Sequence, residues 1–155
     1  MRLFLALLLC AAAAAHAQER YEVISPGSAQ SALPVAREFL RFLSEGDIVE
    51  AAALSNSPMR RHEVLRDYRA SVGEEEFKRV FAEYAARPVV AEIAIGSHRL
   101  IIRDLTDAEN SLAGQYYVDV DGRFLVDDVP NETRASLKRV LQAYRKNARS
   151  SARTD

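Results

Sequence analysis

The chain has little of the chemistry that disulfide-linked, redox or nucleotide-binding proteins require. Its 155 residues include one cysteine, three histidines and no tryptophan. Glycine-rich phosphate loops, a GxSxG nucleophile turn and closely spaced histidine pairs such as HxxxH are all missing from the sequence. Metal binding, nucleotide binding and covalent thiol catalysis are therefore unsupported, and we predict no metal ion and no cofactor.

The single cysteine, Cys10, lies within an apolar run near the N-terminus. Leu9 precedes it, whereas the signals of lipoproteins resemble a pattern with a small residue directly before the cysteine. We therefore expect Cys10 to belong to an N-terminal signal peptide and to be removed when that peptide is cleaved. A mature chain without cysteine forms no disulfides even in an oxidising compartment, so its hydrophobic core must stabilise it unaided.

The first seventeen residues have the order of a secretory signal peptide. Arg2 is followed by an unbroken apolar run over residues 3–15, and Ala15-His16-Ala17 places small residues at the two positions that signal peptidase reads. The apolar run is too short to span a bilayer as a helix. We predict a signal peptide over 1–17, export to the periplasm or the medium, and no transmembrane span after cleavage. A membrane anchor or a buried helix is the alternative.

The mature chain is predicted to form one domain with an uneven distribution of charge. We expect an irregular lead-in over residues 18–31, a single domain over 32–148 and a disordered tail over 149–155. Residues 18–130 carry 13 basic and 20 acidic side chains, whereas residues 131–155 carry seven basic and two acidic ones. Such a basic segment can meet anionic lipid or an acidic partner, or it can be a solvated helix face. Because it lacks interleaved aromatic residues, we predict no nucleic-acid partner.

Helical spacing dominates the first half of the mature chain, and alternation dominates the second half. The pattern predicts a helix from Pro34 to Gly46, a second from the capping box Asp47–Glu50 through Leu54, a third from Ser57-Pro58, and a fourth from a capping box at Ser71–Glu74 to Arg87. Four strands follow, beginning at residues 89, 98, 112 and 123, with the fourth ending at 129 and a tight turn at Asp121-Gly122. A last helix is capped by Asn131.

This order predicts an α+β fold in which the N-terminal helices pack on a curved four-stranded antiparallel meander, with an added C-terminal helix. Two segments, Ala36–Ser55 and Gln115–Val129, carry a resemblance to the nuclear-transport-factor-2-like superfamily: a helix, glycine break and second helix, then a closing aromatic hairpin. The resemblance implies a curved sheet wrapped around a helix, with a cone-shaped cavity. The helix after Asn131 departs from that pattern, and so does the lack of a hairpin between the second and third helices.

Two-residue turns at 96–97 and 121–122 fix which side chains share a face of the predicted sheet, because directly opposed residues point the same way. One face collects the apolar side chains that we expect the N-terminal helices to cover. The other face carries Tyr117, Phe124 and Val126, which would then be exposed. We therefore expect a homodimer to form through this outer face.

The same register predicts a candidate site. Tyr116 opposes Asp127 on the covered face, and His98 lies at its rim. A carboxyl on an apolar face loses solvation, which suits acid–base chemistry, and the neighbouring phenol could donate to a developing oxyanion. The resemblance implies the same, since enzymes of that superfamily often place Asp, His and Tyr in the cone. The alternative is a structural Tyr–Asp hydrogen bond where water reaches the sheet end.

These residues leave two functions open. The first is an exported module that binds a small apolar ligand or assembles with a partner, with the pocket lined by Phe39, Phe42, Leu100, Ile102, Val118 and Leu125. The second is an isomerase, dehydratase or hydrolase that uses Asp127, Tyr116 and His98 in the cone. The first leads because the sequence carries no strong catalytic signature. An unpaired buried Asp127 would cost stability, so in the second case Asp127→Asn is expected to leave the fold as stable or more stable.

Overall fold

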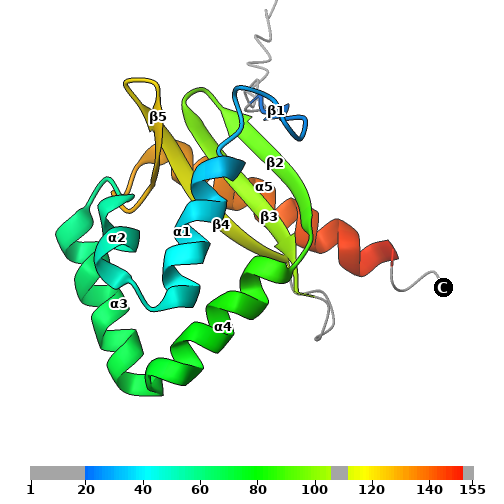
Figure 1. Ribbon diagram of the computed structural model, residues 1–155. Coiled ribbons are helices and arrows are strands. Elements are labelled where there is room, and N and C mark those ends of the chain that lie inside the picture. The colour runs from blue at the N-terminus through cyan, green and yellow to red at the C-terminus, as the bar shows by residue number, and fades with distance from the viewer. Residues whose placement is uncertain (1–19, 106–111, 152–155) are drawn as a thin grey trace, which may run out of the picture.

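Helices and strands are segregated along the chain, as the change in apolar spacing at Val89 predicts. The structure is a computed structural model that describes residues 20–105 and 112–151. Within these ranges the fold is α+β, with one five-stranded antiparallel sheet in the order β1-β2-β3-β4-β5 and five helices. The sheet lies between two helical layers, because α5 covers one face and the N-terminal helices cover the other (Figure 1).

Local signals set the bounds of the N-terminal helices. The helix α1 spans Leu33–Glu45 and ends at Gly46, whose φ of 80° is the left-handed conformation that favours glycine. The helix α2 spans Ile48–Ala53, and the Asp47 side chain accepts a hydrogen bond from the Glu50 N–H, as a capping residue should. The helices α3 and α4 span Pro58–Val72 and Glu74–Ala86. The predicted cap at Ser71 is wrong, since Ser71 lies within α3 and donates to the Tyr68 carbonyl.

The strands form a meander with the predicted register. β2 spans Val89–Ile95, β3 His98–Asp104, β4 Leu112–Val120 and β5 Arg123–Val126. Ile95 pairs with His98 and Val120 with Arg123, so both two-residue turns are confirmed. β5 stops at Val126, three residues before the predicted end, and Val126 also bonds to the segment after α2: its N–H donates to the Leu54 carbonyl and its carbonyl accepts from the Asn56 N–H.

The segments outside the predicted domain differ in part from expectation. Within the expected irregular lead-in, Glu22–Val23 forms a short strand, β1, that pairs with β2 and makes the sheet five-stranded. The last helix, α5, spans Glu132–Ser151, so residues 149–151 continue the helix and are not a loose tail. The predicted signal peptide over 1–17 lies outside the described residues, as do residues 106–111 and 152–155.

The grouping of residues on each face of the sheet is confirmed, but the expected assignment of helices to the faces is wrong. Ile101, Tyr117 and Val126 are buried in a core cluster with Phe39, Leu40 and other residues of the N-terminal helices. On the opposite face, a second cluster packs against α5 and contains Ile93, Leu100, Ile102, Leu137 and Leu141. The face that we expected to be exposed is therefore covered by the first four helices of the chain.

Three charged side chains lie buried on the face that packs against the N-terminal helices. Glu92 accepts hydrogen bonds from the Ala32 N–H and the Ser31 hydroxyl, both at 2.6 Å, and so caps the start of α1 from β2. Arg103 donates to the carbonyls of Ala85 and Arg87 at the end of α4. A negative charge at a helix N-terminus and a positive charge at a helix C-terminus are both favourable to the helix dipole.

Arg99, the third buried charged residue, lies at the other end of the face that packs against the N-terminal helices. Its Nε donates to the Gln30 carbonyl at 3.0 Å, and its guanidinium lies 5.1 Å from the centre of the Phe124 ring. Each buried charge on this face therefore binds backbone groups of a neighbouring element, which compensates for lost hydration.

Replacing Gly122 tests the turn between β4 and β5. Asp121 and Gly122 both have positive φ, at 54° and 82°, as a type I′ turn requires. A Cβ at Gly122 would meet no atom within 4 Å, so any cost comes from the backbone conformation alone. We expect Gly122→Val to lower the free energy of unfolding by about 1–2 kcal/mol in urea denaturation. An unchanged midpoint would contradict this turn assignment.

Alkaline pH tests the burial of Tyr117. Burial raises the pKa of this phenol well above its usual range, because its side chain is enclosed between the sheet and the helices. The unfolded chain loses the Tyr117 proton near pH 10 while the folded chain keeps it, so the stability is fully present below that pH. Above pH 10, unfolding becomes easier by about 1.4 kcal/mol per pH unit from this group. Tyr117→Phe should remove that part of the slope, and an unaltered slope would show that Tyr117 ionises in the folded protein.

Candidate functional site

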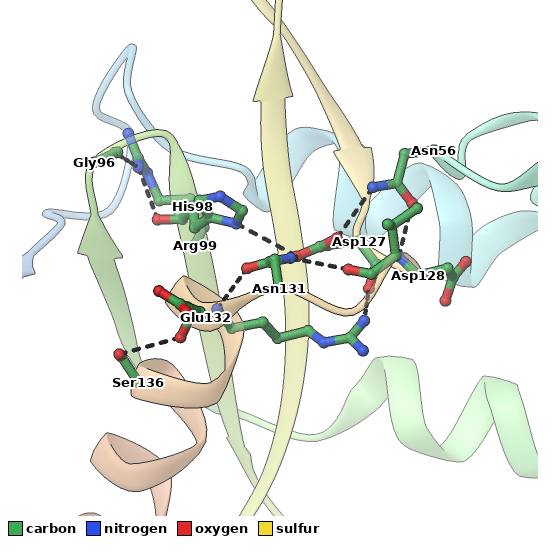
Figure 2. Close-up of polar contacts among 11 residues, drawn as sticks. Asn56, Gly96, His98, Arg99, Asp127, Asp128, Asn131, Glu132 and Ser136 are labelled. Atoms are coloured by element: carbon green, nitrogen blue, oxygen red, sulfur yellow. Dashed lines mark hydrogen bonds and ion pairs between the residues drawn. The ribbon is translucent and has the colours of Figure 1, made fainter.

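Asp127 lies at the centre of a polar joint between the two helical layers. Its side chain is 1% exposed, and its Oδ1 accepts a hydrogen bond from the Asn56 Nδ2 at 3.0 Å. Its Oδ2 accepts from the Asn131 Nδ2 at 2.9 Å, so both oxygens have amide donors (Figure 2). Because Asn56 follows α2 and Asn131 precedes α5, one carboxylate connects both layers.

Asp128 extends this joint toward the N-terminal helices. Its carboxylate forms an ion pair with Arg61 of α3 and accepts a hydrogen bond from the Ser55 hydroxyl at 2.5 Å. Asn56 also accepts from the Asp128 N–H at 2.8 Å, so this amide side chain binds both acids at once. We call Ser55, Asn56, Arg61, Asp127, Asp128 and Asn131 the acidic joint. Its contacts are those of a structural centre whose polar groups are satisfied.

His98 contacts the acidic joint from the start of β3. Its Nδ1 lies 3.4 Å from the Asp127 Oδ2 and is buried without a hydrogen-bond partner, while its side chain is 18% exposed. Figure 2 shows the imidazole on the side of Asn131 opposite Asn56. The two residues form an ion pair only when the imidazole is protonated. The expected proximity of His98 and Asp127 is therefore present, with the carboxylate already bound by two amides.

Tyr116 and Asp127 are hydrogen-bonded to each other through their backbones, but the Tyr116 side chain lies in a pocket away from the acidic joint. The Asp127 N–H donates to the Tyr116 carbonyl at 2.9 Å, whereas the Tyr116 ring lines a pocket between β4 and α5 with Lys138 and Arg145. Burial raises the pKa of the Tyr116 hydroxyl, and the positive charges of Arg145 and Arg134 oppose that rise. The carboxylate and the phenol that were predicted to form one site therefore lie in two places: Asp127 in the acidic joint and Tyr116 in the pocket.

The pocket between β4 and α5 has a volume of about 350 Å³ and a mixed lining. Its apolar wall is formed by Ala113, Gly114 and Leu141, and its polar wall by Tyr116, Lys138, Gln142 and Arg145. The Arg145 Nε donates to the Leu112 carbonyl at 2.9 Å, which holds this guanidinium beside the end of β4. A Cβ at Gly114 would lie 2.7 Å from Leu100 and 2.8 Å from Leu141, so glycine permits the close approach of α5 to the strand.

The six residues expected to line one pocket are divided between the two faces of the sheet. Phe39 is buried in the cluster of the N-terminal helices, and Phe42 packs against it. Leu100 and Ile102 are fully buried under α5. Val118 and Leu125 pair with each other across β4 and β5 and are partly buried. None of these side chains lines the described pocket.

The residues that motivated a dimer are also buried. Tyr117 is 1% exposed and Val126 6% exposed, and Phe124 packs against the same cluster. The expected interface through this face is therefore wrong, because the chain's own helices cover it.

Several polar residues of the acidic joint and of the pocket between β4 and α5 are not predicted from the sequence. Asn56 is not among the predicted site residues, although an Asx residue between two helices is a common capping and turn residue. The sequence predicts Lys138 and Arg145 only as part of a basic segment and does not single out Gln142, yet their spacing of three and four residues puts all three on one side of α5. A strand that contains glycine opposite such a face, as Gly114 does, signals a close contact.

Among residues 20–105 and 112–151, no group of three or more His, Cys, Asp or Glu side chains is placed to hold a metal ion. No helix in the same ranges is long and apolar enough to cross a membrane.

The chain was also compared with known proteins. No protein-family model matches it, and neither a curated protein nor a solved structure matches it. The resemblance to the nuclear-transport-factor-2-like superfamily therefore stays a prediction from the sequence, and the site must be interpreted from its own geometry.

The contacts of Asp127 reverse the expectation for its substitution. Asp127→Asn leaves one carbonyl oxygen where two amide donors, from Asn56 and Asn131, each need an acceptor. We expect a loss of about 1–3 kcal/mol in the free energy of unfolding, because a buried donor becomes unsatisfied. Asp121→Asn is the control, since Asp121 is exposed and Asn suits its turn position. Equal stability of the two variants in urea denaturation would argue against a structural role for Asp127.

Proposed function

We propose that the chain is an exported binding module without catalytic activity, which takes a small ligand into the pocket between β4 and α5. The observation that carries this proposal is the separation of the expected catalytic groups. The Asp127 carboxylate accepts hydrogen bonds from two amides in the acidic joint, and the Tyr116 ring lines the pocket. An acid–base pair needs both groups within reach of the same substrate atom.

The lining of the pocket supports a ligand that is partly apolar. Ligand sites combine an apolar wall with a few directed polar groups, and a volume of about 350 Å³ lies at the small end of their range. Leu141 and the Ala113-Gly114 backbone offer the apolar wall, and Tyr116 and Gln142 offer hydrogen bonds. The proposal of export rests on the order of the first seventeen residues alone.

One contact favours a second candidate, an isomerase, dehydratase or hydrolase. The Asp127 Oδ2 lies 3.4 Å from the His98 Nδ1 without a hydrogen bond between them, and an acid orients a general base through such a bond, which is often long in an unliganded protein. In that case His98 would act and Asp127 would position it. The binding function is preferred because neither residue lines the described pocket, where a small substrate would be held.

Blocking the pocket with a bulky side chain tests the proposal. Gln142 lines the pocket from α5, whereas Ala143 lies beside it on the helix, is exposed and is not part of the lining. We expect a panel of small carboxylic acids, phosphate esters, alcohols and amines to contain a compound that raises the Tm of the wild type and of Ala143→Trp. Gln142→Trp should not respond. A ligand at a hundred times its Kd stabilises the folded state by about 2.7 kcal/mol, which a thermal-shift assay detects readily.

Two results of this screen would contradict the proposal. If no compound of the panel raises the Tm of the wild type, the pocket is not a ligand site for these classes. If a compound raises the Tm of Gln142→Trp as much as that of Ala143→Trp, the ligand binds elsewhere. Turnover of a bound compound that is lost in His98→Gln would favour the enzyme.

A further inference from the structure

The basic residues of α5 form a cationic stripe along one side of the helix. At about 100° per residue, its six basic residues fall within an arc of about 140°, namely Arg134, Lys138, Arg139, Arg145, Lys146 and Arg149. The apolar residues Leu137, Val140, Leu141 and Tyr144 lie on the other side and pack on the sheet. Four of these cations, Lys138, Arg139, Lys146 and Arg149, are exposed, whereas Arg134 and Arg145 are partly buried at the edge of the sheet.

Three cations of this stripe are uncompensated within the described chain. Arg134 and Arg145 donate to the backbone carbonyls of Asp127 and Leu112, and such contacts fix the guanidinium groups but do not neutralise them. Among the described residues, Lys138, Lys146 and Arg149 take part in no ion pair. The acidic residue of α5, Glu132, lies in its first turn, where the helix dipole favours it.

We infer that α5 docks this stripe on an anionic lipid surface. The apolar side of the helix is already buried against the sheet, so attachment would be electrostatic and peripheral. The cations extend over about 22 Å along the helix axis, which fits a broad, evenly charged plane, and each Lys or Arg near such a surface contributes about 1 kcal/mol. The stripe carries no aromatic side chain on which bases could stack, which favours lipid over single-stranded nucleic acid.

This inference is independent of the pocket ligand, although Lys138 and Arg145 belong to both places. The pocket opens beside the stripe, so a docked module would present its pocket to the lipid headgroups. The ligand screen and the docking experiment measure different events, and either proposal can fail while the other stands.

Vesicle sedimentation tests the docking of the stripe. The full chain from residue 18 is mixed with vesicles of phosphatidylcholine alone or with about 30% phosphatidylglycerol, at low and high salt. We expect binding only to the anionic vesicles, with strong loss at about 0.5 M NaCl, where charges are screened beyond a few ångströms. The triple variant Lys138→Gln, Lys146→Gln, Arg149→Gln should lose about a hundredfold in partition coefficient, as three surface cations are removed.

The matched control removes the same charge from other helices. Arg37, Arg60 and Arg66 are exposed on α1 and α3, and their joint replacement by Gln should leave vesicle binding within about threefold of the wild type. Thermal melts of both triple variants verify that they fold. The inference is overturned if both variants lose binding equally, if phosphatidylcholine vesicles bind as well, or if a DNA duplex at the same salt binds more tightly through the same three residues.

Discussion

The structure depends on the burial of both faces of one sheet. Tyr116 and Tyr117 are neighbours on β4 and must point to opposite faces, because side chains alternate along a strand. Tyr117 is enclosed by the N-terminal helices, and Tyr116 lies against α5. A sheet with large apolar groups on both sides needs a helical layer on each side. The C-terminal helix is thus required by the meander and is not an appendage to it.

A sheet covered on both faces needs polar contacts that hold its layers in register, and these occur at element ends. Glu92 caps α1 from β2, Arg103 binds carbonyls at the end of α4, and the Arg69 Nη1 donates to the Gly46 carbonyl at the end of α1. The acidic joint does the same where β5 ends. In each case a charged side chain satisfies backbone or amide groups that a helix or strand end leaves unpaired. The buried charges therefore specify where each helix sits, while the two apolar clusters supply most of the stabilisation.

The sequence is informative about elements and register because those depend on neighbouring residues. Gly46, the cap Asp47, Asn131 and the Asp121-Gly122 turn act within a few residues of themselves, and each has its predicted role. The assignment of helices to faces could not be predicted in the same way. Both faces of the meander carry apolar side chains, so alternation alone does not say which face meets which helices. Because Tyr116 and Tyr117 are adjacent on one strand, the sequence does indicate that large side chains lie on both faces of the sheet and that both faces are covered.

For the candidate site, too, the sequence predicts contacts between neighbouring strands but not contacts with distant segments. Register predicts correctly that Asp127 and Tyr116 are backbone neighbours, since the Asp127 N–H binds the Tyr116 carbonyl. It does not predict what else reaches the carboxylate. Asn56 comes from 71 residues earlier in the chain, and its amide arrives only because β5 pairs with the segment after α2. A carboxylate that the strand register places on an open face can therefore already accept hydrogen bonds on both oxygens in the folded protein.

The same packing explains why the open surface lies along α5. The N-terminal layer has four helices that share one face of the sheet and close over Tyr117. The other layer is a single helix, which covers the sheet with one side and leaves its remaining surface to solvent. A lone helix across a sheet also leaves grooves at its flanks, and the pocket lined by Tyr116, Lys138 and Arg145 is such a groove. The asymmetry of the two layers thus places both the pocket and the cationic stripe along α5, and these are the two places where we propose binding.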